Sequence, residues 1–150
     1  MKIEEAIKQT RFENGYQKAL INILYTANWL RDQQTETFKK HNILQQHYNI
    51  LRILKGRYPK AVSPGEIKDV MLDKGNDVTR LVDKLVKLGL AKRNLCKMNR
   101  RKIDIFVTQK GISLLAEISE PFKKQIAALK KNMKESDAEI LSDLLDKFRE

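Results

Sequence analysis

The sequence predicts a mainly α-helical fold with one small β-hairpin. Three observations predict it. Apolar residues recur at helical spacing in long stretches near both ends of the chain, around residues 16–30 and 112–150. Two shorter helical stretches occupy 63–88. The segment 102–107 then alternates polar and apolar side chains, which indicates a strand.

Composition narrows the functional class. The chain has 150 residues, enough for a core of its own, and only 6 glycines and 3 prolines. The 30 Lys and Arg exceed the 19 Asp and Glu, and this net charge of +11 favours a polyanionic partner. The single cysteine, Cys96, allows no intramolecular disulfide. No apolar run reaches the roughly 20 residues of a membrane span, and acidic residues near the N-terminus argue against a signal peptide. We therefore expect a cytoplasmic protein without membrane contact.

The first long helix is predicted from residue 16 to 30. One apolar row consists of Ala19, Leu20, Ile23, Leu24, Ala27 and Leu30. A second row consists of Ile21, Tyr25 and Trp29. A helix that is apolar on two sides has to bury both, so the second row should meet another subunit or a ligand cavity.

The next helix is predicted over 44–55, and Gly56 and Pro59 end it. Its core-facing residues should be Leu44, Tyr48, Leu51 and Leu54. Ala61 and Val62 are then expected to form a short strand.

A pair of short helices follows. Ser63, Pro64 and Glu66 form a capping box with proline at the first helical position. The turn 73–76 interrupts this helix, and a second helix runs to about residue 88, where Gly89 stops it. Its inward residues are Val78, Leu81, Val82, Leu85 and Leu88. Two helices joined by a short glycine-containing turn fit a helix-turn-helix.

The second of these helices exposes polar side chains that could reach DNA. Those side chains are Asp77, Thr79, Arg80, Asp83, Lys84 and Lys87. Thr79 and Arg80 are expected to contact DNA rather than only solvent. Asn76 caps the helix, contacts a base, or does both. Asp77 and Asp83 would repel phosphates, so we expect them to pair with cations on the same helix.

Two strands, 90–95 and 102–107, flank a basic connection at 96–101, and a basic hairpin directly after such a helix is a wing. Arg100 and Arg101 are expected to contact the minor groove or phosphates, the alternative being a solvated turn. Lys97 and Lys102 either lie near phosphates or are solvated.

Thr108 should cap a long helix over 109–132. Its later apolar residues approximate a coiled-coil seam, formed by Leu115, Phe122, Ile126, Leu129 and Met133. Ser136 and Glu139 resemble a capping box for a final helix, whose apolar face carries Ile140, Leu141, Leu144, Leu145 and Phe148.

We interpret residues 1–150 as one domain. A winged helix-turn-helix over about 43–111 is flanked by dimerisation helices over about 1–34 and 112–150. These terminal helices exceed what so small a core can cover, so those of two chains should interlock in a two-fold dimer. Such symmetry would place two recognition helices roughly 34 Å apart, one turn of DNA.

Three motifs in this order resemble the MarR family of bacterial transcription regulators over nearly the whole chain. They are the recognition helix at 79–85 followed by Gly89 and Leu90, the wing at 99–101, and the strand-to-helix segment at 107–111. Asn99 stands where the family's wing motif has aspartate. That aspartate could hold the wing arginine by an ion pair, whereas asparagine offers a neutral hydrogen bond.

The resemblance implies a homodimeric repressor on a palindromic operator, released by a small lipophilic or aromatic ligand. By the matched wing motif, Arg101 would reach the minor groove and Arg100 a phosphate. The expected DNA-binding set is Ser63, Asn76, Asp77, Thr79, Arg80, Lys84, Lys97, Asn99, Arg100, Arg101 and Lys102.

The remaining candidates have two interpretations each. Tyr25, Trp29 and Tyr48 could line a ligand pocket or belong to the core. Cys96 is either an oxidation sensor or inert. His41 and His47 are not on one helical face and have no clustered acid, so no metal site is expected.

No phosphate loop, nucleophile elbow or metal-protease motif occurs, so we expect no enzyme and no cofactor. Two alternative functions stay open. The winged helix could be a protein-interaction module, or it could bind DNA without sequence preference.

Overall fold

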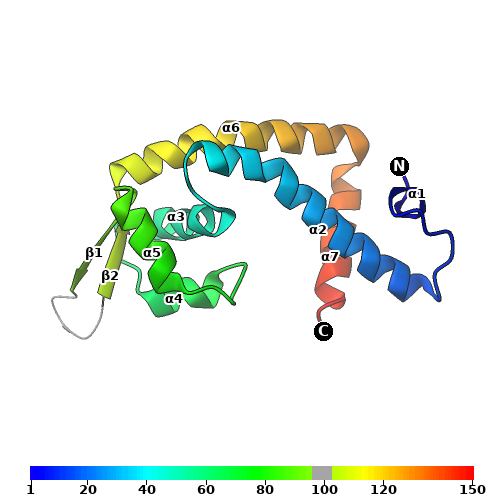
Figure 1. Ribbon diagram of the computed structural model, residues 1–150, viewed down its shortest axis with the longest axis horizontal. Helices are drawn as coiled ribbons and strands as arrows, with labels where there is room; N and C mark the ends of the chain where they lie inside the picture. Colours follow the sequence, from blue (N-terminus) through cyan, green and yellow to red (C-terminus); the bar gives the residue numbers. More distant parts are fainter. Residues whose placement is uncertain (96–102) are drawn as a thin grey trace. The chain divides into compact units, whose positions relative to one another are not determined.

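The computed structural model describes residues 1–95 and 103–150. Over these residues the fold is mainly α-helical with one two-stranded antiparallel sheet, which confirms the predicted fold class (Figure 1). The chain divides into two compact units, Met1–Gln45 and Gln46–Glu150.

The first unit contains a short helix, α1 (Ile3–Ala6), and a long one, α2 (Gly15–Lys40). Asn14 caps α2 by accepting a hydrogen bond from the amide of Gln17 at 2.9 Å. The helix continues well past residue 30, where the prediction ended, because residues 31–37 include good helix formers despite lacking apolar periodicity. Large apolar side chains of α2 are at least 39% exposed: Tyr16, Leu20, Leu24, Tyr25 and Trp29.

The second unit holds the remaining elements. They are α3 (Gln45–Arg57), α4 (Pro64–Val70), α5 (Val78–Lys87), β1 (Ala91–Leu95), β2 (Ile103–Val107), α6 (Gln109–Asn132) and α7 (Glu135–Lys147). Its most buried side chains come from five of these elements and are Ile50, Leu51, Leu54, Ile67, Leu85, Ile105 and Ile118. One core therefore fixes α3, α4, α5, β2 and the start of α6 together.

The prediction for α3 was wrong at its start. Leu44 precedes the helix and is 57% exposed, whereas the preceding Ile43 is buried. Leu51 and Leu54 are buried as predicted, together with His47 and Ile50, which the sequence did not predict as core residues. The inward face of α3 is thus rotated from the predicted one, and Tyr48 is only half-buried.

The hairpin confirms the predicted strands within one residue at each start. β1 and β2 pair antiparallel, with Ala91 opposite Val107 and Leu95 opposite Ile103. Val62 forms a single antiparallel β-bridge with Ile105 of β2. The Val62 amide donates to the Ile105 carbonyl at 2.9 Å, and the Val62 carbonyl accepts from the Ile105 amide at 3.0 Å. This bridge anchors the chain between α3 and α4 to the sheet.

The junction between the hairpin and α6 is tight. Thr108 caps α6, as predicted, by accepting from the Gly111 amide at 3.1 Å, and its hydroxyl donates to the Gly89 carbonyl at 2.7 Å. A Cβ on Gly111 would lie 2.3 Å from the Leu90 carbonyl oxygen. Gly89 has a positive φ of 71°, which suits the turn that ends α5. Helix α6 therefore continues directly from β2 (Figure 1).

The predicted capping box of the last helix was wrong. Helix α7 begins at Glu135, so Ser136 lies inside its first turn and caps nothing. The residue before the helix is Lys134, and its amide donates to the carboxylate of Asp137 in the first turn at 3.3 Å. Most large apolar side chains of α7 are exposed in this chain, at 57% for Ile140 and 48% for Leu141.

Candidate nucleic-acid interface

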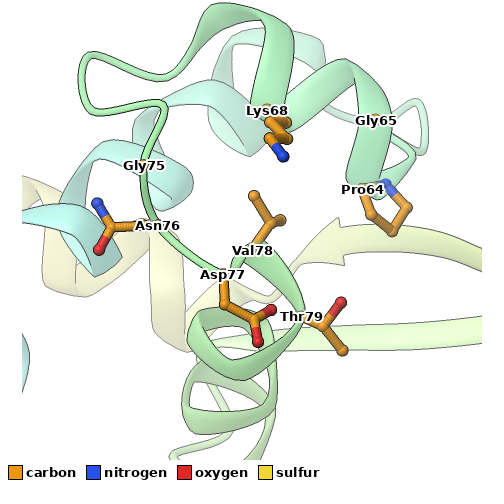
Figure 2. Close-up of a pocket in the computed structure, with 8 residues that line it drawn as sticks. All are labelled: Pro64, Gly65, Lys68, Gly75, Asn76, Asp77, Val78 and Thr79. Atoms are coloured by element: carbon orange, nitrogen blue, oxygen red, sulfur yellow. The ribbon is translucent and has the colours of Figure 1, made fainter.

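A cleft of about 470 Å³ lies between α4 and the first turn of α5. It is lined by Pro64, Gly65, Lys68, Gly75, Asn76, Asp77, Val78 and Thr79 (Figure 2). These residues come from both helices and from the turn that joins them. The cleft therefore coincides with the part of the helix-turn-helix that the sequence assigned to DNA.

Helix α4 begins with the predicted capping box. The Glu66 amide donates to Ser63 Oγ at 3.3 Å, and the Ser63 amide donates to Glu66 Oε2 at 2.8 Å. The Ser63 hydroxyl also donates to Glu66 Oε2 at 2.7 Å. Ser63 thus serves first to fix the start of α4, and its contact with DNA stays a prediction.

Helix α5 is capped by Asp77, not by Asn76. The Asp77 carboxylate accepts from the backbone amide of Arg80 at 3.2 Å. The expectation that Asp77 pairs with a cation of the same helix was therefore wrong, because the free amides at the start of α5 offer a closer donor. Asn76 is half-buried in the cleft wall.

Thr79 and Arg80 lie in the first turn of α5 and both are exposed. Val78, Val82 and Leu85 occupy the opposite side of the helix and are buried. Within the described parts of the chain, the side chains of Thr79 and Arg80 make no hydrogen bond or ion pair. The packing of α5 leaves both free for an external partner.

Lys84 lies in the last turn of α5 and is half-buried, whereas the sequence predicted that it is exposed. It is close enough to His47 of α3 for its charge to act on the imidazole. Burial lowers the pKa of His47 below its ordinary value, and the positive charge of Lys84 lowers it further. Burial and the charge of Lys84 both favour the neutral form of His47, a buried residue of α3.

Asp83 of α5 forms an ion pair with a residue of another element. Its carboxylate accepts from the guanidinium of Arg93 on β1, so the predicted pairing with a cation of the same helix was wrong. Arg93 lies on the same face of the hairpin as buried Ala91, and that face is turned toward α5. This ion pair joins the candidate recognition helix to the strand that leads into the wing.

Lys68 is the residue that the sequence analysis missed. It projects from α4 toward the first turn of α5 (Figure 2). No ion pair neutralises it within residues 1–95 and 103–150. The sequence could have indicated this position, because Lys68 stands four residues after Pro64 and therefore lies on the same side of the helix.

The predicted wing residues Lys97, Asn99, Arg100, Arg101 and Lys102 lie outside the described residues, as does Cys96. The strands that frame them end at Leu95 and restart at Ile103.

The three ligand-pocket candidates fall in different units. Tyr25 and Trp29 lie on α2 of the first unit, and both are exposed. Tyr48 lies on α3 of the second unit, with its ring centroid 5.2 Å from that of Phe122 and its hydroxyl accepting from Arg52 Nη1 at 3.2 Å. Their joint role stays a prediction.

Two kinds of feature are absent from the described residues. None of the helices found there is long and apolar enough to cross a bilayer. Likewise, no group of three or more His, Cys, Asp or Glu side chains in that part of the chain could hold a metal ion.

Comparison with known proteins identifies similar chains. No family model matches the sequence. The HTH-type transcriptional regulator PecS of Dickeya dadantii (strain 3937) is 26% identical over 103 residues, which span 67% of this chain and 62% of that protein. The chain thus matches less than two thirds of the length of this relative.

Solved structures match over more of the chain. A MarR transcription factor from Planctomyces limnophilus has 26% identity and a TM-score of 0.69, covering 91% of this chain and 98% of the other. A mutant MarR from E. coli complexed with operator DNA has 22% identity and a TM-score of 0.71, covering 87% and 93%. The likeness to the DNA-bound MarR mutant shows that the two chains share a fold.

Proposed function

We propose that this MarR-family winged helix-turn-helix protein regulates transcription by binding double-stranded DNA through the first turn of α5. The observation that carries the proposal is the exposure of Thr79 and Arg80 at a cleft, while the other side of α5 is buried. A recognition helix has to be held in this way for its N-terminal residues to reach base edges in the major groove. We propose no catalytic activity for the chain, and we propose that it binds DNA in the cytoplasm.

The charge distribution supports this assignment. Asp77 and Asp83, the two acids that would repel phosphates, are engaged by the Arg80 amide and by Arg93. Lys68 and Arg80 have no such partner among the described residues. With a net charge of +11, the chain offers cations to phosphates at this surface.

We further propose that the wing contributes Arg101 to the minor groove and Arg100, Lys97 and Lys102 to phosphates, with Asn99 beside them. The support is the basic sequence between two strands that pair antiparallel as a hairpin. The Asp83–Arg93 ion pair gives the wing a fixed base on α5.

The proposed active form is a homodimer on a palindromic operator. Its support is the exposed apolar surface of α7, where Ile140, Leu141, Leu144 and Phe148 are at least 48% exposed. Apolar side chains at such density along one helix usually mark an interface. We propose that the dimer represses transcription and that a small aromatic or lipophilic ligand releases it, as the family resemblance implies.

Selection of bound fragments from a random duplex library tests the proposal. We expect enrichment of a palindrome whose half-sites are about 10 base pairs apart, bound with steep salt dependence. Equal retention of all duplexes would instead support sequence-independent binding. A protein that retains no duplex at low salt would contradict DNA binding and favour a protein-interaction module.

A further inference from the structure

The turn between α4 and α5 carries no buried side chain from residue 72 to 77. Met71, which is 3% exposed, precedes this turn, and Val78, which is 6% exposed, follows it. Leu72 is apolar and yet 84% exposed, so burial of its side chain does not hold the turn in place. Packing therefore fixes the two ends of the turn but not the path between them, which leads directly into the first turn of α5.

Among the described residues, one hydrogen bond joins this turn to another element. The backbone amide of Leu72 donates to Oδ1 of Asn49 on α3 at 3.0 Å, although the two residues are 23 positions apart. The other hydrogen bonds of the turn are local, since the Gly75 amide donates to Asp73 Oδ1 at 3.1 Å and Asp77 caps α5. Asn49 is thus the side chain that attaches the turn to the core.

The two ends of α5 are held differently. At its C-terminal end, Lys110 Nζ at the start of α6 donates to the Leu88 carbonyl at 2.9 Å. The Thr108 hydroxyl donates to the Gly89 carbonyl at 2.7 Å. At the other end, the corresponding bond from a neighbouring element is that of Asn49 with the turn. The end of α5 that is exposed at the cleft therefore depends on Asn49 for its attachment.

The anchor itself is rigid. Asn49 directly precedes Ile50 and Leu51, and both of these are 0% exposed. The backbone that carries the Asn49 amide group is therefore fixed in the core of the second unit. An acceptor held in this way restricts the backbone that it binds.

We propose that Asn49 is a positioning residue for DNA recognition, which holds the turn so that the first turn of α5 meets base edges in one orientation. The inference rests on the proposed DNA binding by α5. Asn49 acts through Leu72 and touches neither base nor phosphate. Phosphate contacts give affinity for any duplex, whereas base contacts carry the sequence preference. Loss of the hydrogen bond should therefore reduce sequence preference more than general affinity.

Amide hydrogen exchange of the isotope-labelled full chain tests the hydrogen bond itself. We expect the Leu72 amide to be protected in the wild type, relative to the amide of Lys74 in the same exposed turn. Asn49→Leu removes the acceptor at similar size and should abolish this protection. Asn49→Asp keeps an acceptor oxygen and should retain it. The amide spectrum of each variant reports whether it is folded.

Fluorescence anisotropy with the selected duplex and a scrambled duplex tests the consequence for DNA. Asn49→Leu should weaken binding of the selected duplex roughly three- to tenfold, the effect of one hydrogen bond, and binding of the scrambled duplex much less. The slope of log affinity against log salt concentration should not change, because no phosphate contact is lost. Asn49→Asp should restore the ratio of the two affinities, since its added charge weakens both duplexes alike.

Gln46→Leu is the matched control. It removes an amide side chain from the same helix, and this side chain makes no hydrogen bond with the turn in the described residues. The variant should keep both the Leu72 protection and the ratio of the two affinities.

The outcomes separate this inference from the proposed function. An unprotected Leu72 amide in the wild type, or an unchanged affinity ratio in Asn49→Leu, would overturn the positioning role and leave DNA binding by α5 in place. A smaller salt slope in Asn49→Leu would also overturn it, since a phosphate contact would then have been lost. A wild type that binds no duplex would overturn the proposed function, and this inference with it.

Discussion

The guanidinium of Arg93 on β1 donates to the carboxylate of Asp83 on α5, ten residues earlier in the chain. Both side chains are about half exposed, at 46% for Arg93 and 49% for Asp83. An ion pair at this exposure adds little to stability, but it joins the candidate recognition helix to the hairpin. Its main consequence should therefore be for DNA binding.

A double-mutant cycle tests this pair. Asp83→Asn and Arg93→Gln should each lower the free energy of unfolding by about 0.2–1 kcal/mol, and the double variant should lose less than their sum. Urea denaturation gives the coupling energy. Asp69→Asn on α4 is the control, because no ion pair involves Asp69 in the described residues. Strict additivity of the two changes would show that the pair contributes no coupling.

Gly111→Ala should destabilise the protein by about 1–3 kcal/mol, the usual cost of overpacking. The added Cβ would lie 2.3 Å from the Leu90 carbonyl oxygen and 2.9 Å from Val107 Cγ2, so α6 would have to move away from the hairpin. Gly56→Ala is the matched control, since nothing lies within 4 Å of its Cβ position, and it should be neutral or stabilising. Thermal unfolding of the two variants gives their melting midpoints. Similar midpoints would contradict the close contact of Gly111 with Leu90.

Ser63→Ala should cost about 0.5–2 kcal/mol, because the Glu66 amide loses its acceptor at the start of α4. Ser136→Ala should be neutral or slightly stabilising, since this serine lies inside α7 and alanine favours helix. The two sites share an S-x-x-E pattern, so only the structure distinguishes them. Chemical denaturation that gave equal losses at both sites would contradict this assignment.

Lys68→Ala should weaken DNA binding and reduce the slope of log affinity against log salt concentration by about 0.9, the effect of one phosphate contact. Lys55→Ala removes the same charge from the exposed end of α3, outside the cleft, and should leave the slope unchanged. Fluorescence anisotropy on a selected duplex at several salt concentrations measures both. Identical slopes for the two variants would mean that only net charge matters.

His47 should make stability depend on pH. Its folded-state pKa is lowered by burial and by Lys84, so the unfolded chain binds a proton more readily than the folded one. The contribution of the neutral imidazole is complete above its ordinary pKa of about 6.5 and is lost as the pH falls below that value.

Denaturant titrations between pH 7.5 and 5.5 should therefore show a declining free energy of unfolding. His47→Leu should flatten this decline, while His41→Gln should retain it. A decline of the same size in His47→Leu would assign the effect to other groups.

Much of the fold could be predicted because the signals were local. The capping boxes at Ser63 and the cap at Thr108 act over three residues, and both were predicted correctly. The alternation of β2 and the bounds of α6 followed from side-chain periodicity in the same way. The first turn of α5 was placed correctly because Val78, Val82 and Leu85 mark its buried side.

The errors share a different cause. Leu44 has an apolar side chain at helical spacing, but α3 begins one residue later and Ile43 takes the buried place. Ser136 has a capping pattern, but helix α7 had already begun. At α3 two neighbouring residues satisfied the local pattern, and the buried place went to Ile43.

The sequence by itself determined the class of fold, the order of its elements and which turn of which helix is exposed, because caps and periodicity act within a few residues. Only the tertiary structure decided that Asp83 pairs with Arg93, that Lys84 lies beside His47, and that Lys68 faces the cleft. The physical reason is that a side chain's partner depends on which elements pack together. Residues ten or more positions apart come into contact only where the elements that carry them pack together.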